Sequence, residues 1–137
     1  MSLQILFQSS TKFAKSVPKI FVINTGGTFG FHLISPGVSD QVQLIQGSFQ
    51  TDLKNGKYPK LNKTTTEKIY FENDFCMFCI YDMEPLIDSA DMEMKHWNLI
   101  CDLIKMGYPY FDGFVVVHGT NTMDYTASAL SFMIEVS

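Results

Sequence analysis

Two short apolar runs, each followed at once by a motif of glycine and threonine, most constrain how this chain can fold. Ile20–Ile23 comes just before Thr25-Gly26-Gly27-Thr28, and Phe114–Val117 comes just before His118-Gly119-Thr120-Asn121-Thr122. Short apolar runs bounded by turn residues are typical of strands buried on both faces of a parallel sheet. Because ligands of open α/β sheets bind at the carboxyl ends of the strands, the two motifs predict a polar site there.

The segments after Pro85 predict helices that alternate with these strands. Glu93–Met106 carries apolar residues at helical spacing, and Tyr108-Pro109 ends that helix. A second helix is expected to begin with Asn121 or Thr122 as its cap. Strands alternating with helices predict an α/β fold with a mostly parallel sheet in an αβα sandwich. The strands are too few for a doubly wound sheet, so we expect an incomplete sandwich.

The first half of the chain gives weaker signals. Residues 1–18 are expected to form a flexible leader, and residues 19–137 to form one partial domain. Phe31–Asn62 is rich in Gly, Pro, Ser and Asn and predicts a long loop with a weak helix around Gln41–Ile45. Thr64–Ile80 is expected to be extended, and Tyr81–Pro85 to be a connection.

Charge and cysteine content exclude several classes of function. The formal net charge is −4 with no basic stripe, so no nucleic-acid partner is expected. No apolar stretch has the length of a membrane span, and the lack of a secretory signal favours a reducing, cytoplasmic setting. Cys76 and Cys79 have the spacing of half a zinc or redox site but lack a second pair, so we interpret them as buried apolar residues. No metal and no organic cofactor is expected.

Neither motif fits the common phosphate-binding loops. Thr25-Gly26-Gly27-Thr28 lacks both the Walker A lysine pattern and the dinucleotide glycine spacing. His118 ends a buried strand, so a hydrogen-bonded structural histidine is favoured over a general base. A threonine becomes a nucleophile only when a base or a charged network takes its proton. The two motifs therefore favour nucleophilic chemistry on a small polar substrate.

Three segments together resemble the L-asparaginase family. Asp112–Met133 is similar to the second signature of that family, and Thr25–Gly30 is similar to the first. Pro85–Met92 lies between them and resembles the loop that holds the substrate carboxylate. The likeness is greatest to the bacterial type I, cytosolic branch and its eukaryotic relatives, and it covers the chain from about Lys19 onward.

The resemblance implies a role for each matching residue. Thr28 matches the threonine that attacks the side-chain amide and forms an acyl-enzyme, and Thr120 matches the second threonine, which relays protons. Asp88, Ser89 and Ala90 match the loop for the α-carboxylate, and Thr120 with Asn121 match further substrate-binding positions. The implied reaction converts L-asparagine and water into L-aspartate and ammonia. The resemblance also implies a homo-oligomer when the protein is full length.

Departures from the family keep a second hypothesis open. Asn121 stands where the family has aspartate, and Val38 stands where many members have a mobile tyrosine. The family's catalytic lysine and C-terminal domain are expected beyond Ser137. The alternative is a truncated or degenerate paralogue without catalysis, which binds an amino acid or pairs with a full-length subunit. A third hypothesis, lysophospholipase activity, comes from eukaryotic relatives, but the chain lacks a Gly-x-Ser-x-Gly elbow.

Overall fold

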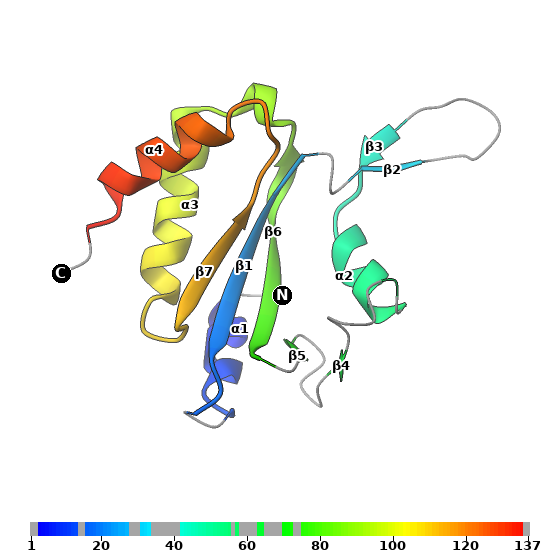
Figure 1. Cartoon of the computed structure of the whole chain (residues 1–137), viewed down its shortest axis with the longest axis vertical. Helices are drawn as coiled ribbons and strands as arrows, with labels where there is room; N and C mark the ends of the chain where they lie inside the picture. Colours follow the sequence, from blue (N-terminus) through cyan, green and yellow to red (C-terminus); the bar gives the residue numbers. More distant parts are fainter. Residues whose placement is uncertain are drawn as a thin grey trace.

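The computed structural model describes most of the chain, namely residues 3–13, 16–27, 31–33, 42–55, 57, 63–64, 70–72 and 75–135. Its elements are shown in Figure 1. In chain order they are α1 (Leu3–Ser10), β1 (Lys19–Gly26), β2 (Phe31–Leu33), β3 (Val42–Leu44), α2 (Ser48–Lys54), β4 (Lys63–Thr64), β5 (Tyr70–Glu72), β6 (Met77–Ile87), a 3₁₀-helix (Ser89–Asp91), α3 (Met94–Gly107), β7 (Gly113–Val117) and α4 (Met123–Met133).

The central sheet has five strands in the order β4-β5-β6-β1-β7. β1 lies between β6 and β7 and pairs with both in parallel, whereas β5 pairs antiparallel with β6 and with β4. Within this sheet only β5 therefore runs against the other strands. This mostly parallel α/β sheet was predicted from the sequence, and it places the carboxyl ends of β6, β1 and β7 side by side.

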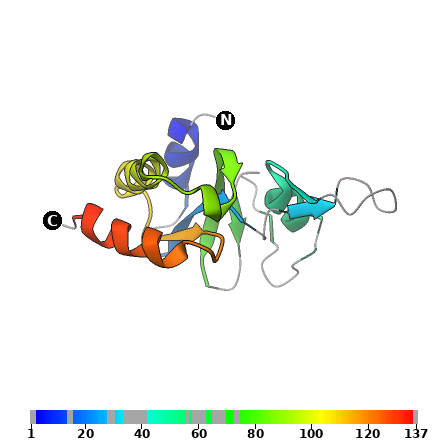
Figure 2. The same ribbon diagram turned by 90° about the horizontal axis from the view of Figure 1, so that it is seen from above.

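One face of the sheet carries the larger core. Phe21 and Ile23 of β1 point to this face, and residues of α1 and α3 pack on them. Leu6 of α1 is only 3% exposed, and Phe7 makes an edge-to-face contact with Phe21 at a ring-centroid distance of 5.4 Å. Figure 2 shows α1 and α3 together on this side of the strands.

The opposite face is covered by α2 over part of its width. Phe49 and Leu53 of α2 pack against Val22, Phe78 and Phe71. Helices on both faces make the described fold a three-layer sandwich. Val115, which pairs with Val22 in the sheet register, is 48% exposed on β7. The α2 layer is therefore partial within the described residues, consistent with the predicted incomplete sandwich.

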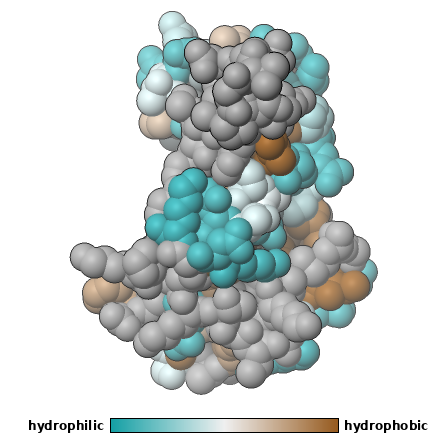
Figure 3. All heavy atoms as spheres, turned by 90° about the vertical axis from the view of Figure 1, so that its right-hand side faces the viewer, coloured by the Kyte–Doolittle hydropathy of each residue, from teal (hydrophilic) through white to brown (hydrophobic). Residues whose placement is uncertain are grey.

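One side chain of α2 and one from the segment before α2 form hydrogen bonds with the part of β6 that β5 leaves unpaired. β5 pairs with β6 only as far as Cys79. Beyond that point Gln50 Nε2 donates to the carbonyl of Ile80 (2.8 Å), and Gln46 Nε2 donates to the carbonyl of Met83 (3.1 Å). Figure 3 shows the molecule from the α2 side, where the hydrophobic residues among the described atoms lie in separate small groups.

Three expectations from the sequence differ from the structure. Residues 3–10, expected within a flexible leader, form helix α1, and Leu6 and Phe7 of this helix pack into the core. Val42–Leu44 is strand β3, paired with β2, and the nearby helix is Ser48–Lys54. Tyr81–Pro85 belongs to strand β6 and is not a connection. None of the helices in the described ranges has the length and apolar character that crossing a bilayer requires.

Candidate functional site

The carboxyl ends of β1, β6 and β7 meet in direct backbone contact. A β-carbon built on Gly27, just after β1, would lie 2.7 Å from both Cα and N of Gly119, just after β7. A β-carbon on Gly119 would lie 2.5 Å from Ser89 Oγ, just after β6. Real β-carbons do not approach other atoms so closely, so glycine is required at both positions. The fold therefore brings all three motifs singled out in the sequence to one place.

The turn after β1 also needs glycine for its backbone conformation. Gly26 has a φ of 122° and Gly27 has a φ of 75°, and side chains rarely tolerate either value. Gly27 N donates to the carbonyl of Ile87 (3.1 Å), which holds the turn against the end of β6. The backbone can leave the sheet sharply here, directly before Thr28.

The loop after β6 is shaped by its own aspartate. Asp88 Oδ1 accepts a hydrogen bond from Ala90 N (2.9 Å), and Asp88 O accepts one from Asp91 N (2.9 Å). The Ser89 side chain is only 3% exposed, and its hydroxyl has no hydrogen-bond partner in the part of the chain that the structure describes. The Ala90 amide is occupied within the loop, whereas the Ser89 hydroxyl is available.

Thr120 and Asn121 lie in the turn between β7 and α4, and both are exposed. Within the described residues, neither side chain makes a hydrogen bond. Thr122, the cap residue of α4, donates from Oγ1 to the carbonyl of Ser89 (2.6 Å). This bond attaches the start of α4 to the loop after β6, so the two segments that carry the predicted substrate-binding residues are joined.

A buried polar network lies behind the turn after β1. Asn24, which is fully buried, donates from Nδ2 to Asp82 Oδ1 (2.9 Å) and accepts from Gly26 N (3.1 Å). Asp82 Oδ2 also accepts from Gly47 N (2.6 Å). Thr25 Oγ1 donates to the carbonyl of Val117 (2.8 Å) and so links β1 to the end of β7. These bonds orient the turn that precedes Thr28.

His118 is hydrogen-bonded through both ring nitrogens, as the sequence predicted for a structural histidine. Its Nδ1 lies 2.6 Å from the carbonyl oxygen of Gly119, and its Nε2 lies 2.8 Å from Thr126 Oγ1. Trp97 Nε1 donates to the same Thr126 oxygen (2.9 Å). The ring is therefore fully engaged with protein groups and is not presented to a substrate.

Not every predicted site residue falls within the described structure. Asp88, Ser89, Ala90, Thr120 and Asn121 do, and they gather at the meeting point of the three strand ends. Thr28 and the Ser35–Asp40 segment lie outside the described residues. Sequence reasoning missed Asn24, Asp82 and Thr126, because no local pattern marks them and their bonds to Asp82, Gly47 and Trp97 join distant parts of the chain.

Glu93, the N-cap residue of α3, is the one group among the described residues whose pKa is clearly displaced. A hydrogen bond and the positive charge of Lys95, whose Nζ lies 2.9 Å from the carboxylate, lower the pKa of Glu93 below its ordinary value. The carboxylate therefore stays ionised at neutral pH. A negative charge here is favourable because the amino terminus of a helix carries a partial positive charge.

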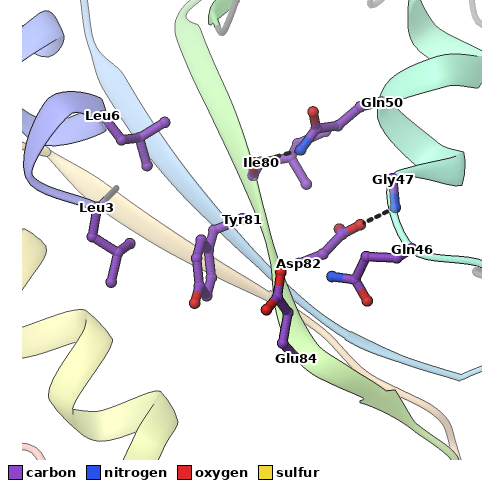
Figure 4. Close-up of a pocket in the computed structure, with 9 residues that line it drawn as sticks. All are labelled: Leu3, Leu6, Gln46, Gly47, Gln50, Ile80, Tyr81, Asp82 and Glu84. Carbon is purple, nitrogen blue, oxygen red and sulfur yellow. Dashed lines mark hydrogen bonds between the residues drawn. The ribbon is translucent and has the colours of Figure 1, made fainter. Parts of the chain in front are cut away.

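A pocket of about 220 Å³ lies against the middle of β6. Figure 4 shows its lining, in which Asp82 bonds to Gly47 and Gln50 bonds to Ile80. None of the predicted site residues lines it. Among the described residues, no three His, Cys, Asp or Glu side chains are grouped closely enough to hold a metal ion.

Comparisons with known proteins match most of the chain to one family. Residues 19–137 match the family model described as "Asparaginase, N-terminal". Over 116 residues, 85% of this chain, the sequence is 38% identical to L-asparaginase 1 of Escherichia coli. It is also 31% identical over 122 residues to the 60 kDa lysophospholipase of Homo sapiens.

A solved structure supports the same relationship. The crystal structure of L-asparaginase I from Vibrio cholerae superposes on 85% of this chain with a TM-score of 0.59 and 36% sequence identity. The chain spans 30% of that protein and of the Escherichia coli protein, and 21% of the human one. With the family model matching residues 19–137, the chain belongs to the asparaginase family, in whose N-terminal region it lies.

Proposed function

We propose that this chain supplies the nucleophile and the amino-acid binding loops of an asparaginase, which hydrolyses L-asparagine to L-aspartate and ammonia. The observation that carries the proposal is the backbone contact of Gly27 with Gly119, together with the close packing of Gly119 against the side chain of Ser89. It gathers, at the carboxyl ends of parallel strands, the three segments that match the family's signatures. Thr28 directly follows Gly27, and consecutive Cα atoms are only about 3.8 Å apart.

The available polar groups fit the two ends of an amino-acid substrate. The Ser89 hydroxyl is free to donate to an α-carboxylate, and the Asn121 side-chain oxygen is free to accept from an α-ammonium group. Ser89 is the first residue of a turn of 3₁₀-helix, and the exposed Thr120 and Asn121 lie just before α4. Thr28 would then be the group that meets the side-chain amide of the bound asparagine.

The chemistry proposed for Thr28 is acyl transfer. Its hydroxyl oxygen bonds to the amide carbon, the C–N bond breaks, and the nitrogen leaves as ammonia after receiving a proton. Water then attacks the resulting ester, which releases aspartate and restores the threonine hydroxyl. In the proposed scheme Thr120 relays the proton to the leaving nitrogen. Backbone N–H groups at the strand ends are suited to stabilise the oxyanion.

Ammonia release from L-asparagine by the purified protein that carries this chain tests the proposal. Thr28→Ala should reduce the release to background, whereas Thr28→Ser keeps a hydroxyl and should retain part of it. Ser128→Ala, which changes an exposed hydroxyl on α4, is the matched control and should leave the rate unchanged. Undiminished release by Thr28→Ala would refute the threonine acyl-enzyme.

A second candidate function is amino-acid binding without catalysis, which Asn121 favours. Asparagine at this position retains the shape of the family's aspartate but lacks its charge. Calorimetric titration with L-aspartate separates the two candidates. If the wild type binds L-aspartate, Ser89→Ala weakens this binding and no ammonia is released, the chain is a binding protein. Such a protein pairs with a full-length subunit or acts alone. Release that requires Thr28 supports the enzyme.

A further inference from the structure

A chain of three hydrogen bonds runs from helix α3 to the candidate site. Trp97 of α3 donates to Thr126 of α4 (2.9 Å), Thr126 is bonded to His118 Nε2 (2.8 Å), and His118 Nδ1 is bonded to the carbonyl of Gly119 (2.6 Å). Thr126 is 2% exposed, so the middle of the chain is shielded from water. Three elements that surround the site are thus linked through polar side chains.

When the imidazole is neutral, the chemistry at the two ends of the chain of bonds fixes the direction of every bond. A carbonyl oxygen can only accept, so Nδ1 of His118 carries the proton and donates to Gly119. Nε2 of the neutral ring is then an acceptor, and the Thr126 hydroxyl must donate to it. The indole N–H can only donate, and it uses a lone pair on the same hydroxyl oxygen. The network therefore selects one tautomer of His118, with the proton on Nδ1.

Orienting the Gly119 carbonyl also orients the Thr120 amide. The two groups belong to one planar trans peptide, in which C=O and N–H point in opposite directions. Gly119 is packed against Gly27 and Ser89, so this peptide forms part of the meeting point of the strand ends. Among the described residues the Thr120 N–H donates to no acceptor. It is consequently held in a fixed direction and is available to a bound molecule.

Helix α4 attaches this peptide and the Ser89 loop through neighbouring threonines. Thr122 and Thr126 are four residues apart and so share a face of α4. Thr122 bonds to the carbonyl of Ser89, and Thr126 bonds to His118. Each threonine holds one of the two segments that carry the predicted substrate-binding residues.

We propose that His118 is a positioning residue, which Thr126 and Trp97 hold in the Nδ1-protonated tautomer so that the Gly119–Thr120 peptide presents its N–H to the substrate. The substrate part of this proposal rests on the function proposed above. The hydrogen-bond network itself does not rest on that function, so the network can be tested without a ligand. Trp97 is the only tryptophan of the chain, which makes its indole N–H a single, assignable NMR signal.

The first test is ¹⁵N NMR of the full chain with the imidazole neutral. We expect His118 to be protonated on Nδ1 in the wild type. Thr126→Val should give a mixture of His118 tautomers and should shift the Trp97 indole and Thr120 amide signals. Thr126→Ser keeps the hydroxyl, so its His118 tautomer, Trp97 indole signal and Thr120 amide signal should match those of the wild type. An Nε2-protonated wild type, or a Thr120 amide unchanged in Thr126→Val, would overturn the proposal.

Variants of His118 itself distinguish positioning from packing. His118→Asn places an amide nitrogen near the position of Nδ1 and should keep the Thr120 amide signal close to that of the wild type. His118→Leu fills similar space without a donor and should shift that signal. Ser131→Ala removes an exposed hydroxyl of α4 that bonds only within the helix, to Ser128, and should change nothing. Equal shifts in His118→Asn and His118→Leu would contradict a role for the Nδ1 donor.

Titration with L-aspartate then tests the link to the substrate. Loss of one well-oriented neutral hydrogen bond should weaken binding by Thr126→Val about fivefold to tenfold, with Thr126→Ser close to the wild type. Equal affinities of Thr126→Val and the wild type would overturn the substrate part of the proposal. No binding by the wild type would count against the proposed function. The His118 tautomer and the Thr120 amide signal in the NMR test would still decide whether His118 is a positioning residue.

Discussion

Gly27 and Gly119 touch through their backbones, although they are far apart in the sequence. A β-carbon on Gly27 would lie 2.7 Å from Gly119 Cα, and one on Gly119 would lie 3.4 Å from Gly27 Cα and 2.5 Å from Ser89 Oγ. No side chain separates the turn after β1 from the turn after β7. The turn after β1 and the turn after β7 are therefore in direct contact at the carboxyl end of the sheet.

Gly119→Ala should destabilise the protein and separate these turns. The added methyl group would collide with Ser89, whose main chain is already bound by Thr122, so the loop must shift. We expect a loss of about 1–3 kcal/mol, typical of overpacking, in urea unfolding. Gly113→Ala is the matched control, because its β-carbon would meet only the end of the Ile20 side chain at 3.0 Å. Equal stability of the two variants would contradict the tight contact.

The Asn24–Asp82 pair should contribute strongly to stability. Asp82→Ala would leave Asn24 Nδ2 and Gly47 N without their acceptor. Each buried polar group that loses its partner costs about 1–3 kcal/mol, so we expect a total loss of about 2–4 kcal/mol in urea unfolding. Asp102→Ala removes an exposed carboxylate from α3 and should cost less than about 0.5 kcal/mol. A similar, small loss in both variants would show that the network contributes little.

Sequence reasoning found the elements whose signals are local. The apolar periodicity of 93–106 predicts α3, and the runs at 20–23 and 114–117 predict β1 and β7. Parallel pairing then brings their carboxyl ends together. The polar network of Asn24 and Asp82 could not be predicted, because it depends on the register between β1 and β6.

The N-terminal helix was missed for a similar physical reason. Residues 3–10 have no acidic residue in the first turn and no basic residue in the last, so their own sequence gives little support to a helix. The helix is stabilised by tertiary packing, in which Phe7 contacts Phe21 and Phe111. Val42–Leu44 was likewise predicted wrongly, because its pairing with Phe31–Leu33 overrides local propensity.

The contribution of α1 can be measured with a pair of adjacent residues. Leu6 is 3% exposed in the main core, whereas Ile5 is 55% exposed on the same helix. Leu6→Ala should reduce the free energy of unfolding by about 2–4 kcal/mol through lost burial and a cavity. Ile5→Ala should change it by no more than about 0.5 kcal/mol. If both changes are small in thermal and urea unfolding, α1 does not contribute to the core as described.

Asn121→Asp should strengthen the binding of an amino-acid ligand. Asn121 is exposed at the carboxyl end of β7, next to Thr120, and its amide can offer a substrate ammonium group only a neutral acceptor. A carboxylate there adds a charge-assisted hydrogen bond, worth about 1.5–3 kcal/mol, which corresponds to about tenfold to hundredfold tighter binding of L-aspartate in calorimetry. Asn98→Asp makes the same chemical change at an exposed position of α3 and controls for net charge. An equal gain in L-aspartate affinity in both variants would show that the added negative charge acts by long-range attraction of the ligand's ammonium group. No gain in Asn121→Asp would place the ammonium group elsewhere.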